Sequence, residues 1–73
     1  MTKVLFQIYP LDCAGCAQKI ESQVNELNGI ETVIIFPQLG KIRVIFDNKK
    51  VTIYQIEEAI LLTGHPVYST ITA

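Results

Sequence analysis

Residues 4–29 read VLFQIYPLDCAGCAQKIESQVNELNG, and this stretch contains the strand-to-helix transition that decides the fold. Its first five residues alternate between two faces, as a strand does. Pro10 ends this strand because a proline ring has no N–H to donate to a neighbouring strand. From about Ala14 the apolar residues recur every three or four positions, which predicts a helix that ends at Gly29.

The only two cysteines of the chain, Cys13 and Cys16, stand between this strand and this helix. A thiol binds metal or exchanges with a disulfide as the thiolate, and the N-terminus of a helix lowers the pKa of a thiol placed there. Two thiolates held close together can bind a soft metal ion or carry out disulfide exchange. The position therefore indicates metal binding or redox chemistry.

Composition indicates one small soluble domain that spans residues 1–73. Of the 73 residues, 49% are hydrophobic, which is enough for a single core without disulfides or structural metal. A net charge of −1 without a basic stripe argues against a nucleic-acid partner. No stretch approaches the roughly 20 apolar residues of a membrane span, and no signal-peptide pattern opens the sequence. We therefore expect a cytoplasmic protein without membrane insertion.

The remaining sequence predicts three more strands, a hairpin loop and a second helix. The strands are expected at 30–36, 41–46 and 67–71, with the loop at 37–40. Thr52 and Gln55 form a capping-box pattern that starts the second helix, and Gly64 ends it. The order is β-α-β-β-α-β. With the right-handed crossover rule, it predicts an α+β, ferredoxin-like fold in which one antiparallel sheet carries both helices on one face.

Three other interpretations of the cysteine pair compete with a site for one exchangeable metal ion. Two buried core thiols are disfavoured because both cysteines lie in a turn beside Gly15. A four-thiolate structural zinc site needs a second Cys or His pair, which only a dimer of this chain could supply. A small thiol–disulfide oxidoreductase stays open as the alternative function. Thioredoxin-like chains are longer, however, and commonly have a proline where this chain has Ala14-Gly15.

Several motifs together resemble the heavy-metal-associated domain family. They are DCAGCA at 12–17, KIE at 19–21, LNGI at 27–30, KIRV at 41–44 and GHPV at 64–67. The resemblance covers nearly the whole chain. This family includes small copper chaperones and the N-terminal domains of metal-transporting P-type ATPases. It implies that Cys13 and Cys16 bind Cu(I), or in some branches Zn(II), Cd(II) or Hg(II), and pass the ion to a partner domain of the same fold.

The predicted protein is a metal carrier without catalytic residues or a separate cofactor site. Cu(I) and Zn(II) are d¹⁰ ions, and an ion bound by only two thiolates can accept a third ligand. A partner's thiolate can then bind before one of the first pair leaves. We expect one ion per chain, a heavy-metal-transporting P-type ATPase as partner, and a monomer in the apo form, with a metal-bridged dimer as the alternative. The short chain favours Cu(I).

Two other side chains are candidate ligands. Asp12 resembles the residue found before the first cysteine in the zinc-, cadmium- and lead-transporting branch, and a carboxylate suits Zn(II) better than Cu(I). Its alternative role is an N-cap or helix-dipole partner. His65 follows the second helix, and some cyanobacterial copper chaperones also have a histidine in this loop. It is a candidate ligand for either ion, and its alternative is an ordinary surface residue.

Two positions depart from the family pattern. Leu11 stands where a methionine commonly packs under the metal loop. Because leucine is close to methionine in volume, we expect Leu11 to preserve this packing. Pro37 stands where a phenylalanine is common, which predicts an early end to the second strand.

Overall fold

The computed structural model describes residues 1–72, apart from the side chain of Ala14. It contains β1 Thr2–Ile8, α1 Ala14–Asn25, β2 Ile30–Phe36, the 3₁₀ turn η1 Pro37–Leu39, β3 Lys41–Phe46, α2 Ile53–Leu61 and β4 Val67–Thr72. This order confirms the predicted β-α-β-β-α-β arrangement, and β2 ends just before Pro37. The predicted domain limit at Ala73 lies outside the described residues.

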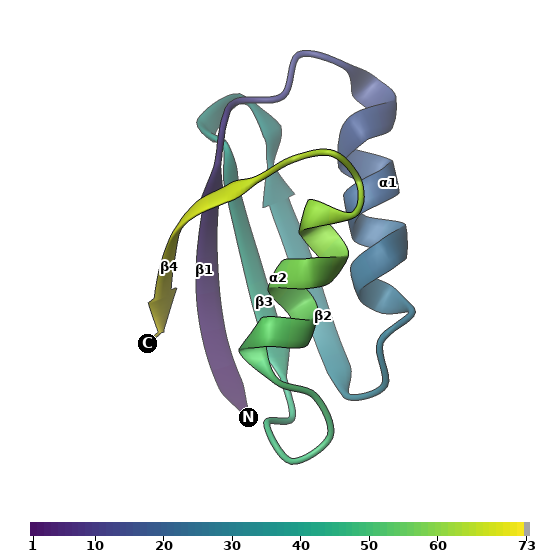
Figure 1. The fold of residues 1–73 in the computed structure, drawn as a ribbon, viewed down its shortest axis with the longest axis vertical. Coiled ribbons are helices and arrows are strands. Elements are labelled where there is room, and N and C mark those ends of the chain that lie inside the picture. The colour runs from purple at the N-terminus through teal and green to yellow at the C-terminus, as the bar shows by residue number, and fades with distance from the viewer. Residues whose placement is uncertain (73) are drawn as a thin grey trace.

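The four strands form one sheet in the order β2-β3-β1-β4, and all three neighbouring pairs are antiparallel. Figure 1 shows α1 and α2 together over one face of this sheet. The predicted ferredoxin-like fold is therefore confirmed. Within residues 1–72, neither helix is long and apolar enough to cross a lipid bilayer.

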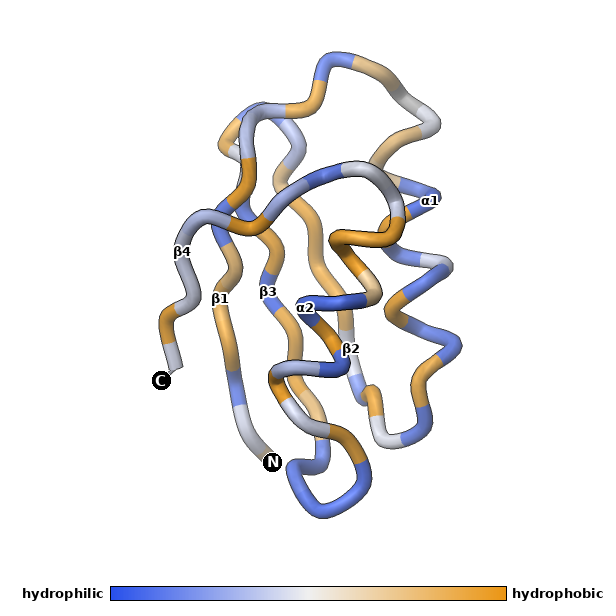
Figure 2. Tube along the Cα trace, viewed as in Figure 1, coloured by the Kyte–Doolittle hydropathy of each residue, from blue (hydrophilic) through white to orange (hydrophobic). Residues whose placement is uncertain are grey.

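The hydrophobic core lies between the helices and the sheet. Alternate residues of the two central strands point into it, and each helix contributes one apolar stripe. The fully buried side chains are Val4, Phe6, Ile8, Ile42, Val44 and Phe46 from the sheet and Ile20, Val24, Ile56 and Ile60 from the helices. Burial of each stabilises the fold by about 1.5–3 kcal/mol relative to an exposed position. In Figure 2 the hydrophilic residues of α1 lie on its outer side.

The start of α2 is capped as predicted. The Gln55 N–H donates to the Thr52 hydroxyl oxygen at 3.2 Å, and the Thr52 N–H donates to the Gln55 side-chain oxygen at 2.9 Å. This capping box satisfies two N–H groups that an uncapped helix would leave without partners.

Both helices end earlier than the sequence predicts. The last residue of α1 is Asn25, and Leu27 beyond it donates its N–H to the Val24 carbonyl at 3.1 Å in a tighter turn. In the same way, α2 ends at Leu61, ahead of Gly64. The predicted helix ends were wrong because the last turns of both helices change from α-type to i→i+3 hydrogen bonds.

Candidate metal centre

The two cysteines lie together at the start of α1. Cys13 is the N-cap residue, and Cys16 belongs to the first turn. Their Cα atoms are 5.6 Å apart, and their sulfur atoms are joined in a disulfide. The Cys13 side chain is exposed, whereas that of Cys16 is half-buried and packs against the core. Two electrons and two protons would reduce this disulfide to two thiols within one helical turn.

The start of α1 offers its backbone N–H groups to a negative charge. The Cys13 side chain makes no capping hydrogen bond, and the first turn contains no acidic residue. Free N–H groups and the helix dipole favour anions at this position, so they favour the thiolate form of the pair after reduction. Asp12 precedes the N-cap residue, so its predicted alternative role as the N-cap is wrong.

Hydrogen bonds to the β2–β3 turn hold the cysteine loop in place. The Leu11 N–H donates to the Pro37 carbonyl at 2.8 Å, and the Ile8 N–H donates to the Gly40 carbonyl at 2.7 Å. The Leu11 side chain is 8% exposed and belongs to the core. The predicted packing role of Leu11 is therefore confirmed.

Gly40 is required where the turn and β1 meet. It has a φ of 65°, in the left-handed region that L residues rarely adopt. A Cβ on Gly40 would collide with the carbonyl oxygen of Ile8. Glycine at this position lets the β2–β3 turn approach the strand that leads into the cysteine loop.

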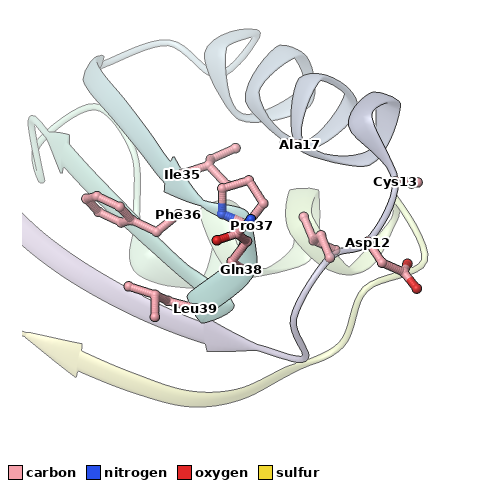
Figure 3. Close-up of a pocket in the computed structure, with 9 residues that line it drawn as sticks. Asp12, Cys13, Ala17, Ile35, Phe36, Pro37, Gln38 and Leu39 are labelled. Carbon is pink, nitrogen blue, oxygen red and sulfur yellow. The ribbon is translucent and has the colours of Figure 1, made fainter.

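An apolar concavity lies between the cysteine loop and η1 (Figure 3). It is lined by Leu11, Asp12, Cys13, Ala17, Ile35, Phe36, Pro37, Gln38 and Leu39. Leu39 is 61% exposed and Phe36 is 37% exposed. Sequence reasoning missed these turn residues, although an apolar leucine within a hairpin loop is a signal that could have identified them.

Asp12 lies within the cysteine loop, whereas His65 lies in a separate loop. Asp12 is exposed and directly precedes Cys13, and in Figure 3 its carboxylate points away from η1. His65 is half-buried in the α2–β4 loop, which Figure 1 shows at the same end of the sheet as the cysteine loop. Among residues 1–72, no three His, Cys, Asp or Glu side chains are grouped so that they could hold a metal ion. Ligation by Asp12 or His65 stays a prediction.

Sequence comparisons relate this chain to metal-binding proteins. The sequence matches the family model of the heavy-metal-associated domain over residues 5–66. The copper chaperone CopZ of Bacillus subtilis (strain 168) is 33% identical over 67 residues, which are 92% of this chain and 97% of the chaperone.

Solved structures show the same fold. The N-terminal domain of a potential copper-translocating P-type ATPase from Bacillus subtilis, in its Cu(I)-loaded state, superposes with a TM-score of 0.83 at 28% identity. The superposition covers 92% of this chain and 85% of that domain. A copper-binding domain from HMA7, a P-type ATPase, gives a TM-score of 0.86 at 22% identity over 96% of this chain and 97% of that domain.

These matches confirm the resemblance predicted from the motifs around Cys13 and Cys16. The relative that is 33% identical is a copper chaperone, and the matching family model describes a heavy-metal-associated domain. The chain belongs to the heavy-metal-associated domain family.

Proposed function

We propose that this heavy-metal-associated domain binds one Cu(I) ion through Cys13 and Cys16 and transfers it, in the cytoplasm, to a P-type ATPase. The observation that carries the proposal is the pair of cysteines, with Cα atoms 5.6 Å apart, at a helix start without a side-chain cap. The choice of copper is supported by the CopZ relative, whose alignment covers 92% of this chain at 33% identity. The P-type ATPase as partner is supported by the similar N-terminal domain from Bacillus subtilis.

The different exposure of the two cysteines supports transfer rather than storage. Thiolate is a soft ligand that suits Cu(I), and a d¹⁰ ion imposes no fixed geometry. Cys16 packs against the core, while Cys13 is exposed and open to a second protein. A partner thiolate can therefore join the ion on the Cys13 side before the original pair releases it. The ion need not pass through a state without ligands.

The apolar concavity beside the loop provides a contact surface for the partner domain. Phe36 and Leu39 line this concavity together with Cys13, and both expose apolar surface. Burying this surface against a partner would favour the transfer complex, because apolar area is removed from water. In the apo form the chain is a monomer, and a metal-bridged dimer is the alternative state of the loaded form.

Zn(II) or Cd(II) is the alternative cargo, and it would use Asp12 or His65 as well as the cysteines. An exposed carboxylate beside Cys13 can rotate toward an ion, and Zn(II) accepts oxygen ligands more readily than Cu(I) does. His65 lies in a loop at the same end of the sheet and could supply an imidazole nitrogen to either ion.

An anaerobic competition titration tests the proposed cargo. The reduced protein is titrated against chromophoric chelators of Cu(I) and of Zn(II), together with a Cys13→Ser/Cys16→Ser variant. We expect one equivalent of Cu(I), bound far more tightly than Zn(II), and loss of Cu(I) binding in the double variant. A double variant that still bound one equivalent of Cu(I) would overturn the assignment of the two cysteines.

Thiol–disulfide exchange is the second candidate function, and the Cys13–Cys16 disulfide is the observation that favours it. One thiolate of the reduced pair would attack a substrate disulfide and form a mixed disulfide, and the second would displace the substrate. The pair would end as this intramolecular disulfide, and the substrate as two thiols. Insulin reduction, compared with an equal concentration of free dithiothreitol, separates the two candidates. For a metal carrier we expect no acceleration over the free dithiol.

A further inference from the structure

The sheet face opposite the helices carries an apolar row that crosses all four strands. Leu5 on β1 pairs with Arg43 on β3 and with Ile71 on β4, and Arg43 pairs with Ile34 on β2. These positions alternate with the buried ones, so their side chains lie on the side of the sheet away from the helices. Three of the four residues in the row are apolar.

A groove follows this row. Its lining includes Lys3, Leu5, Ile34, Arg43, Ile45 and Ile71. Ile34 is 38% exposed and Ile71 is 51% exposed. A group of neighbouring apolar side chains at the surface is typical of an interaction site, whereas single exposed apolar residues are ordinary. The groove is therefore a candidate docking surface.

The same face carries positive charge. Lys3, Lys41 and Arg43 occupy its outward strand positions, and they are three of the six cationic residues of the chain. Glu31, at the bulge that begins β2, is the only acidic residue in the four strands. The Arg43 guanidinium lies 6.0 Å from the centre of the Phe36 ring, so it remains on this face. A cationic, apolar face on a chain of net charge −1 is complementary to an acidic, apolar partner.

We propose that this groove docks an amphipathic acidic segment of a partner protein. Its apolar side chains would cover Leu5, Ile34 and Ile71, and its carboxylates would pair with Lys3 and Arg43. This inference goes beyond the proposed copper transfer and does not depend on it. The groove is lined by Lys3 and Leu5 in the N-terminal half of β1. The cysteine loop follows the C-terminal end of that strand, at the other end of the sheet (Figure 1). A docked segment would leave the cysteines accessible.

Two other occupants fit this face less well. Symmetric pairing of two copies through their sheets would bring the face that carries Lys3 and Arg43 against the same cationic face of the other copy, and like charges in contact are unfavourable. Attraction to an anionic membrane would contribute about 1 kcal/mol of binding free energy for each Lys or Arg near the membrane surface. Three cations are fewer than the clusters of about four to eight that characterise lipid-binding surfaces. A protein segment with matched carboxylates is favoured.

A synthetic helical peptide of about 18 residues, with one leucine stripe flanked by glutamates, is a direct probe. Amide shifts of the reduced, ¹⁵N-labelled protein are followed during titration. We expect the largest shifts at residues 3–5, 43–45 and 71. Arg43→Glu should weaken binding about tenfold, which corresponds to about 1.4 kcal/mol. Lys49→Glu makes the same charge change on the β3–α2 turn, and there we expect a change below about twofold.

Several outcomes would overturn this inference. Equal losses in the two charge variants would show nonspecific attraction, and no shifts at millimolar peptide would show no docking. Binding instead to phosphatidylglycerol vesicles would assign the face to a membrane. Concentration-dependent dimers that Arg43→Glu abolishes would assign it to a second copy. If Arg43→Glu does not fold, as judged from its amide NMR spectrum, Lys3→Glu is used in its place.

A Cys13→Ser/Cys16→Ser variant should bind the peptide as the unchanged protein does. Failure of the proposed copper binding and failure of peptide docking can therefore be distinguished.

Discussion

The backbone N–H of Leu11 donates to the carbonyl of Pro37 at 2.8 Å, which joins the cysteine loop to the β2–β3 turn. The Leu11 side chain continues from this contact into the core. The position of Cys13 and Cys16 therefore depends on a residue that binds no metal.

Leu11→Ala should destabilise the reduced apo protein by about 2–4 kcal/mol, because it removes a buried side chain and leaves a cavity. Loss of this support should also weaken Cu(I) binding. Urea unfolding measures the first effect, and chelator competition measures the second. Leu62, which is 74% exposed, provides the control: Leu62→Ala should change the free energy of unfolding by less than about 0.5 kcal/mol. Equal effects of the two substitutions would contradict the packing role of Leu11.

Gly40→Ala should be more damaging than Gly64→Ala. Both glycines have positive φ values, 65° and 95°, so alanine is strained at either position by about 1–2 kcal/mol. Only at Gly40 would the new Cβ also collide with the Ile8 carbonyl, whereas no atom lies within 4 Å of a Cβ at Gly64. Thermal unfolding of the two variants measures the difference. A Gly40→Ala protein as stable as Gly64→Ala would show that the turn can move away from β1 without loss.

Thr52→Ala should lower the free energy of unfolding by about 1 kcal/mol, because the capping box at the start of α2 loses its side-chain acceptor. Tyr54 lies in the same helix and is 83% exposed. Tyr54→Ala should therefore change stability by less than about 0.5 kcal/mol. Urea unfolding followed by circular dichroism compares them. If Thr52→Ala has no larger effect than the control, the capping box contributes little to stability.

Asp12→Ala should lower the affinity for Zn(II) about tenfold and leave the affinity for Cu(I) within about threefold. The expected difference arises because a carboxylate is a useful ligand for Zn(II) but adds little to a Cu(I) site. Glu21→Ala removes an equal charge from an exposed position on α1 and is the matched control. Unchanged Zn(II) affinity in Asp12→Ala would remove Asp12 from the ligand set. His65→Ala, measured in the same way, decides the role of the imidazole.

The sequence predicts the fold well where local patterns have clear ends. β2 and β3 have the predicted bounds because their Ile-, Val- and Phe-rich runs are bounded by Gly29, Pro37 and Gly40. The helix ends could not be predicted in the same way. Leu27 and Thr63 continue the helical spacing of apolar or buried residues, yet each lies in an i→i+3 turn beyond its helix. Periodicity alone does not distinguish such a turn from one more turn of α-helix.

The site was predictable to the extent that its residues are close in sequence. Cys13 and Cys16 share one helical turn, so their spacing alone places them together. The apolar concavity depends on Leu11 and Pro37, which meet only when β1 and the β2–β3 turn pack side by side. Asp12 and His65 come from different loops, and sequence spacing cannot determine whether their side chains reach one ion.

Transfer of Cu(I) from Cys13 and Cys16 to an acceptor domain can be followed by NMR. The Cu(I)-loaded, ¹⁵N-labelled protein is mixed anaerobically with the unlabelled apo N-terminal domain of the Bacillus subtilis P-type ATPase. We expect the amide signals of residues 12–17 to move toward their apo positions as the apo acceptor is added. They should keep their metal-bound positions when Cu(I)-loaded acceptor is added instead. Signals that stay at their metal-bound positions with excess apo acceptor would contradict a role for Cys13 and Cys16 in Cu(I) transfer.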